Sequence, residues 1–187
     1  MSDSIKIFKS ATLFGGAMNI TDSLEYLETV EMGKLLAANG YMVKNGGYGG
    51  MMEAVSKGAS QEGAIVEGYT CATFGEHPGN EYLTRELKRI DIYDRLRSLI
   101  SDTDIFIAQK GGLGTLAEVF LTLDIIRKKP KSQRPILILY GAFWTEVMVP
   151  VMNIPLVHDR EKNLFIIIDT LEDFENLIKM YEPQKIL

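Results

Sequence analysis

The sequence contains very little cysteine and histidine. Its 187 residues include one cysteine, Cys71, and two histidines, His77 and His158. A single cysteine cannot form an internal disulfide, so the fold does not depend on a disulfide framework. These residues are also too scattered in the sequence to form the ligand clusters of a structural zinc site. We therefore expect no bound metal, a structural Cys71 near a strand end, and a His77 that is either solvent-exposed or part of a lid.

Long apolar runs and an excess of basic residues are also absent. No stretch of about 18 consecutive apolar residues occurs, so we expect no membrane-spanning helix. The start MSDSIKIFKS lacks the basic region and long apolar core of a signal peptide, which leads us to expect a cytoplasmic protein. The net charge of −5 argues against a nucleic-acid-binding protein. The basic stretch 127–134 is therefore interpreted as a solvated helix end.

Short apolar runs alternate with helical patterns along the whole chain. The predicted strands are 5–8, 41–45, 64–70, 104–109, 135–140 and 164–169. The predicted helices are 23–40, 51–63, 91–102, 115–129, 143–153 and 171–182, and residues 71–89 are predicted to be a loop. Strands that are apolar throughout indicate burial on both faces. The alternation predicts one Rossmann-like α/β domain over residues 1–187, with a doubly wound, mostly parallel sheet and helices on both faces.

Two glycine-rich turns follow predicted strands. One lies in 45–54 and the other in 109–118. The first turn contains Gly46, Gly47, Gly49 and Gly50, and the second contains Gly111, Gly112 and Gly114. Glycine lets backbone N–H groups approach a ligand closely, and the following helix N-terminus suits phosphate. Two such turns at the carboxyl ends of two strands favour a nucleotide- or sugar-phosphate-binding site.

Neither turn is a standard nucleotide fingerprint. No Gly-Lys-Ser/Thr sequence ends either turn, which excludes the P-loop pattern. A dinucleotide fingerprint should follow the first strand, and the sequence after 5–8 does not fit it. ATPase and dehydrogenase functions are therefore not our leading predictions.

Four polar side chains in these turns are open to two interpretations each. Thr115 either caps the helix or binds a phosphate oxygen. Glu118 stands at the capping-box spacing from Thr115, and either satisfies a backbone N–H or points at a substrate. Tyr48 either stacks on a base or packs, and Glu53 either contacts a ribose or caps a helix.

Three segments together resemble the LONELY GUY family, formerly labelled lysine decarboxylase-like. They are GGYGGMMEAVSKGA at 46–59, DRLRSLI at 94–100 and GGLGTLAE at 111–118. The resemblance covers roughly residues 5 to 140. In this register the family's arginine corresponds to Arg95 and its glutamate to Glu118.

The resemblance implies a phosphoribohydrolase. Such enzymes split the N-glycosidic bond of a nucleoside 5′-monophosphate, in some members a cytokinin nucleotide, into free base and ribose 5-phosphate. It implies that Glu118 stabilises an oxocarbenium-like transition state or activates water, and that Arg95 binds phosphate or the departing base. It also implies a homodimer and no cofactor. No residue supports a lysine decarboxylase.

The sequence departs from the family pattern near these residues. Lys110 replaces the proline before the second glycine pair, and Leu96 replaces the lysine after the arginine. The usual glycine of the opening loop is interpreted as Ser10. The chain thus lacks the family's lysine at position 96 and has an additional lysine at position 110. Lys110 is therefore a candidate to bind the phosphate in place of the missing lysine. The departures leave an alternative function open, a non-catalytic carrier or sensor that binds a nucleotide or a cofactor.

Overall fold

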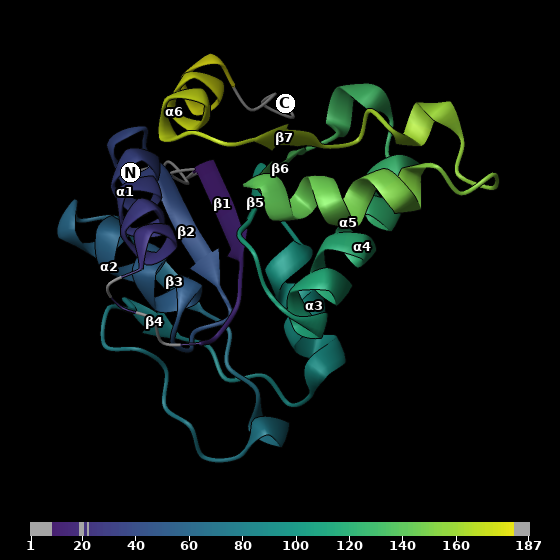
Figure 1. Cartoon of the computed structure of the whole chain (residues 1–187). Coiled ribbons are helices and arrows are strands. Elements are labelled where there is room, and N and C mark those ends of the chain that lie inside the picture. Colours follow the sequence, from purple (N-terminus) through teal and green to yellow (C-terminus); the bar gives the residue numbers. More distant parts are fainter. Residues whose placement is uncertain (1–8, 19–20, 22, 182–187) are drawn as a thin grey trace, which may run out of the picture.

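The computed structural model describes residues 9–18, 21 and 23–181, and shows a parallel sheet between two layers of helices (Figure 1). The strands are β1 Lys9–Phe14, β2 Tyr41–Asn45, β3 Val66–Gly68, β4 Arg85–Glu86, β5 Ile105–Ala108, β6 Ile136–Tyr140 and β7 Ile166–Ile168. The α-helices are α1 Leu24–Ala38, α2 Met51–Gln61, α3 Ile92–Ile100, α4 Leu113–Lys128, α5 Ala142–Met152 and α6 Leu171–Met180. Three short 3₁₀ helices are η1 Ala72–Phe74, η2 Lys131–Gln133 and η3 Asp159–Glu161.

The strand order confirms the predicted doubly wound fold. The seven described strands run β4-β3-β2-β1-β5-β6-β7, and each neighbouring pair is parallel. The chain builds outward from β1 to β4 and then returns to pair β5 with the free side of β1. In a sheet of this kind, ligands bind beyond the carboxyl ends of the strands where the order reverses. That point lies between β1 and β5.

Each face of the sheet has its own apolar core. Side chains of α1, α2 and α6, such as Leu36, Val55 and Phe174, pack against one face. Side chains of α3, α4 and α5, such as Leu99 and Trp144, pack against the other. Successive strand residues point to opposite faces, so the buried strands are apolar on both sides. Among the described residues, no helix is both long and apolar enough to cross a membrane.

Two sequence predictions need comment. The predicted strand 5–8 lies outside the described residues, and the first described strand begins at Lys9. The prediction that 71–89 is only a loop was wrong. The segment contains η1, the strand β4 and a bridge between Cys71 and Arg89. A two-residue strand has no periodicity to detect, and β4 exists because it pairs with the edge of β3.

Candidate functional site

Three loops, rather than two, meet at the carboxyl edge of the sheet. Besides the two predicted glycine turns, Gly15 and Gly16 follow β1 directly. Gly16 N–H donates to the Lys110 carbonyl at 3.1 Å, and the Gly16 carbonyl accepts from Met51 N–H at 3.0 Å. The first loop is thereby bound to both of the others, at the point where the strand order reverses.

The structure corrects the interpretation of Ser10 as the opening-loop residue. Ser10 lies inside β1, and its hydroxyl donates to the Asp102 carbonyl at 2.7 Å. Phe14-Gly15-Gly16, which follows the same phenylalanine-x-glycine pattern, occupies the loop position instead. The sequence signal was present, but the opening loop was placed at Ser10 instead of after Phe14.

Arg95 on α3 is buried and held from several sides. It is 6% exposed, and its Nε donates to the Tyr69 carbonyl at 2.7 Å. A Cβ on Gly46 would lie 1.9 Å from Arg95 Nη2, so only glycine leaves room for the guanidinium there. Arg95 is therefore not a solvated surface arginine.

Glu118 on α4 faces Arg95 across the site. Its Oε1 lies 3.2 Å from Arg95 Nη1, and the Glu118 side chain is only 10% exposed. The N-cap of α4 is Gly112, so Thr115 is the third helical residue and Glu118 lies one turn further on. The capping-box interpretation of Thr115 and Glu118 is wrong for this reason. The carboxylate is directed at a cation from another helix.

The environment of Glu118 changes its acidity. Burial raises the pKa of the Glu118 carboxyl to about 7, and the attraction of the Arg95 guanidinium opposes this rise without cancelling it. A carboxyl that titrates near neutrality can serve as a general acid or base. Few structural carboxyls are arranged in this way, so the observation marks a candidate functional group.

The second glycine turn packs tightly against the start of α4. A Cβ on Gly111 would lie 2.2 Å from Thr115 Oγ1 and 2.9 Å from Gly16 N. Thr115 is buried beneath this turn, and the helix begins at Leu113 with Gly112 and Gly114 exposed. The N-terminus of α4, with its positive dipole end, is thus presented at the edge of the sheet.

The first glycine turn adopts backbone conformations that favour glycine. Gly47 and Gly50 have φ values of +83° and +67°. Tyr48 lies between them, and its hydroxyl accepts from Cys71 N–H at 2.8 Å. The Tyr48 ring centroid lies 6.0 Å from Arg95 Cζ. Tyr48 therefore links this turn to the 71–89 segment.

Two other candidate side chains have partners on α1. Lys110 Nζ forms an ion pair with the Glu25 carboxylate, and the Lys110 side chain is 49% exposed. Glu53 Oε1 accepts from the Tyr26 hydroxyl at 2.9 Å. Both contacts hold α1 against the site. They lie beside the glycine turns, whereas the Arg95–Glu118 pair lies deeper.

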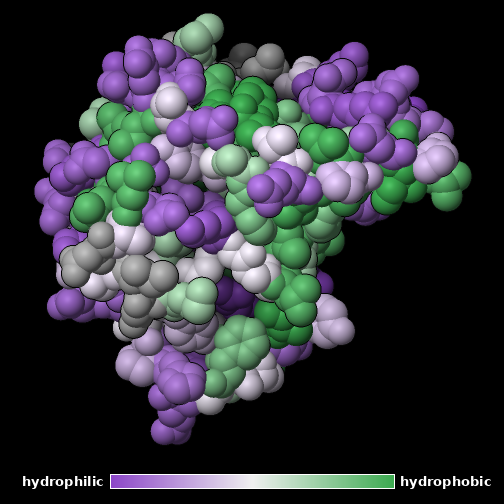
Figure 2. Space-filling model, in the orientation of Figure 1, coloured by the Kyte–Doolittle hydropathy of each residue, from purple (hydrophilic) through white to green (hydrophobic). Residues whose placement is uncertain are grey.

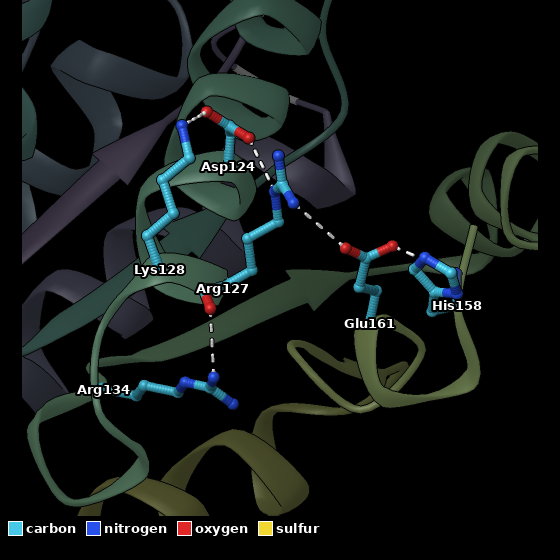
Figure 3. Close-up of polar contacts among 6 residues, drawn as sticks. All are labelled: Asp124, Arg127, Lys128, Arg134, His158 and Glu161. Carbon is cyan, nitrogen blue, oxygen red and sulfur yellow. Dashed lines mark hydrogen bonds and ion pairs between the residues drawn. The ribbon is translucent and has the colours of Figure 1, made fainter. Parts of the chain in front are cut away.

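The basic stretch 127–134 is engaged in local contacts (Figure 3). Arg127 bonds to Asp124 at 2.6 Å and to Glu161 at 3.3 Å, which ties the end of α4 to η3. Lys128 also pairs with Asp124, at 2.6 Å, and Arg134 donates to the backbone of Arg127. Arg127 and Lys128 pair with nearby carboxylates, and Arg134 donates to carbonyls at the end of the helix, as expected for a helix terminus.

Comparison with known proteins identifies the family. Residues 9–148 match the sequence model of the SLOG cluster4 family, which is most of the chain. The chain belongs to the SLOG cluster4 family. This family is one of the SLOG group, which includes LONELY GUY-like proteins. Membership of the LONELY GUY family itself is a finer assignment than this match carries.

Individual relatives are distant in sequence and close in fold. An uncharacterized protein of Archaeoglobus fulgidus is 28% identical over 122 residues, covering 63% of this chain and 76% of that protein. The structure of TM1055 has a TM-score of 0.71 and 24% identity, covering 92% of this chain and 99% of the other. The molybdenum cofactor carrier protein of Chlamydomonas reinhardtii has a TM-score of 0.72 and 20% identity, covering 92% and 96%. At such identities the two structures show a shared fold.

The Glu118 geometry predicts a specific pH dependence of stability. The folded-state pKa of about 7 lies above the unfolded value, so the folded protein binds this proton more tightly. The resulting stabilisation is fully present below the unfolded pKa and is lost as the pH rises through about 7. We expect wild-type stability to fall relative to Glu118→Gln between about pH 5 and about pH 8, by at most roughly 3 kcal/mol.

Urea denaturation of both proteins at the two pH values measures this difference. Glu62→Gln, at an exposed position after α2, is the control and should follow the wild type. Parallel pH dependences for wild type and Glu118→Gln would contradict the assigned burial of the carboxyl.

Proposed function

We propose that the protein hydrolyses the N-glycosidic bond of a nucleoside 5′-monophosphate and releases free base and ribose 5-phosphate. One observation carries the proposal. A buried arginine and a buried carboxyl of raised pKa contact each other, and the arginine lies against Gly46 of the first glycine turn. The resemblance of both residues to the LONELY GUY pattern adds support. The proposed reaction needs no metal and no cofactor.

The proposed chemistry assigns a role to each group. The N-terminus of α4 and the turn 111–115 hold the phosphate. The bond between the anomeric carbon and the base nitrogen breaks, and the Glu118 carboxylate stabilises the positive charge that develops on the ribose. Water then attacks the anomeric carbon, and its proton passes to the departing base. Arg95 donates hydrogen bonds to the base as negative charge develops there.

A non-catalytic carrier is the second candidate. The Arg95–Glu118 contact favours it, because the ion pair occupies the carboxylate oxygen Oε1 that a catalytic carboxylate would direct at the substrate. The similarity to a molybdenum cofactor carrier protein also supports it. In this alternative the same turns bind a phosphorylated small molecule, and Glu118 holds Arg95 in position by the ion pair.

A panel of nucleoside monophosphates, including a cytokinin nucleotide, distinguishes the two functions. We expect the wild type to release free base, and Glu118→Gln to lower kcat by about 10²–10⁴-fold, as for loss of a general acid or base. Arg95→Lys should lower kcat/KM, whereas Arg97→Lys on the exposed side of α3 should not. Tight binding without release from any substrate would establish the carrier. Undiminished release by Glu118→Gln would refute the proposed mechanism.

Lys110 is proposed to contact the phosphate once a ligand displaces Glu25. The exposed Lys110–Glu25 pair contributes little stability, so this exchange costs little. We expect Lys110→Ala to raise KM for the nucleotide several-fold at unchanged kcat. Glu25→Gln frees the same lysine and should leave KM unchanged or lower it. An unchanged KM in Lys110→Ala would refute the role.

A homodimer is proposed from the exposed apolar side chains. Those on α4, on α5 and just after α5 are Leu113, Leu121, Val149, Ile154 and Leu156. Figure 2 shows hydrophobic residues gathered on the side of the molecule formed by α3, α4 and α5. Apolar surface of this kind is typical of protein–protein contacts. Light scattering after size exclusion should give twice the chain mass, and Val149→Glu should lower it. A monomeric mass for the wild type would exclude the dimer.

A further inference from the structure

Phe74 occupies an unusual position in the 71–89 segment. It ends η1, its side chain is 44% exposed, and it belongs to none of the apolar cores formed by the described residues. A single exposed phenylalanine is ordinary by itself. Phe74, however, lies beside the buried arginine of the candidate site. Its ring centroid is 5.8 Å from Arg95 Cζ.

The part of the segment that carries Phe74, residues 71–80, is fixed to the first glycine turn at both ends. At one end, Cys71 N–H donates to the Tyr48 hydroxyl at 2.8 Å. At the other, Asn80 N–H donates to the Gly47 carbonyl at 2.8 Å, and the Asn80 amide donates to the Tyr48 carbonyl at 3.0 Å. Figure 1 shows this segment below the carboxyl edge of the sheet. The position of Phe74 thus follows from the glycine turn itself.

Phe74 and Tyr48 form a pair of aromatic rings on one side of Arg95. Their centroids are 6.2 Å apart and the rings are tilted by 45°. Both rings lie within about 6 Å of the guanidinium, a distance at which cation–π attraction holds it in place. The exposed ring of Phe74 leaves aromatic surface free for another planar group. Figure 2 shows that this face of the molecule is hollowed near its lower middle, with hydrophilic atoms inside the hollow.

Pairwise contacts and the course of α4 connect four kinds of group in succession, which we call the row. The aromatic pair is followed by the Arg95 guanidinium, then by the Glu118 carboxyl at 3.2 Å, and then, one helical turn back, by Thr115 under the Gly111 turn. A ligand that lies along this row meets a stacking surface at one end and a helix N-terminus at the other. A planar ring suits the first end and a phosphate the second.

We propose that Phe74, with Tyr48, is the ring-binding wall of the site, and that the ligand is a phosphate ester that carries a planar heteroaromatic ring. The inference rests on the proposed function for the position of the phosphate and extends it to the other end of the ligand. It assigns Arg95 to the ring end of the site rather than to the phosphate. It also gives the 71–89 segment a function, which is to present Phe74.

Binding measurements on three probes test the proposal. The probes are AMP, a pterin monophosphate and ribose 5-phosphate, which carries the phosphate without a ring. Stacking on one aromatic side chain is worth about 1–3 kcal/mol per base, which corresponds to about 5- to 150-fold in Kd. We expect Phe74→Ala to weaken binding of the preferred ring-bearing probe by this factor and to leave ribose 5-phosphate unchanged. The preferred ring identifies the ligand as a nucleotide or a pterin.

Two further variants exclude a merely structural effect. Tyr93→Ala removes an aromatic side chain that is 76% exposed, two residues before Arg95 and hence on another side of α3, and it should change no affinity. Phe74→Trp retains a stacking surface, so it should keep the wild-type Kd within about threefold, and its fluorescence should fall when the ring-bearing probe binds.

Each outcome separates this proposal from the proposed reaction. Weaker AMP binding by Phe74→Ala in a protein that releases no base supports the ring wall and refutes the hydrolase. Base release with equal AMP affinity in wild type and Phe74→Ala overturns the ring wall and keeps the hydrolase. The ring wall is also overturned if the wild type binds ribose 5-phosphate as tightly as either ring-bearing probe. The same holds if the wild type binds none of the three probes.

Discussion

The central strand β1 has to pair with neighbours on both sides, and the site depends on that constraint. The chain leaves β1 through α1 toward β2, builds that half of the sheet, and then returns to place β5 against the other side of β1. Right-handed crossovers carry the helices of the two halves to opposite faces. The loops after β1 and β5 therefore begin side by side, and Gly16 N–H donates to the Lys110 carbonyl at 3.1 Å. Glycines at 15–16, in 46–50 and in 111–114 lie in the loops that meet at this edge of the sheet.

The Arg95–Glu118 pair is better explained by function than by stability. At an effective dielectric constant of about 20, two opposite charges at about 4 Å attract by about 4 kcal/mol. Removing each charge from water costs several kcal/mol, so a buried pair contributes little net stability. The raised pKa of Glu118 shows the same balance, because burial outweighs the attraction of the arginine. Such a carboxyl accepts or donates a proton near neutral pH.

The alternation of strands and helices was predicted well from the sequence. Apolar runs such as 135–140 and 104–109 appear as β6 and β5 with ends shifted by one residue. The segments with helical spacing of apolar residues gave the six α-helices of the described residues, since a helix that buries one face repeats its apolar residues every three to four positions. The prediction failed where local pattern carries no signal. β4 has two exposed residues and owes its existence to its partner strand.

Part of the candidate site could be proposed from the sequence and part was missed. The two parts differ in how much of their signal is local. The two glycine turns could be identified from residue types and spacing, because glycine at a strand end has local chemical meaning, whereas Glu118 and Arg95 were singled out by the resemblance to the LONELY GUY family. The Gly15–Gly16 loop was missed because the opening loop was placed at Ser10, which lies inside β1. Phe74 was missed because nothing in an exposed loop distinguishes a ring beside an arginine from any other phenylalanine.

The sequence by itself determined the fold class and the residue types available for phosphate and proton chemistry. Hydrophobic periodicity and glycine positions are local properties, and they can be read along the chain. Only the tertiary structure decided that Glu118 pairs with Arg95 instead of capping its helix, and that Lys110 turns toward Glu25. Those choices depend on which helices and loops become neighbours when the sheet closes around β1. Burial and pKa arise from that packing of distant segments, which no local pattern contains.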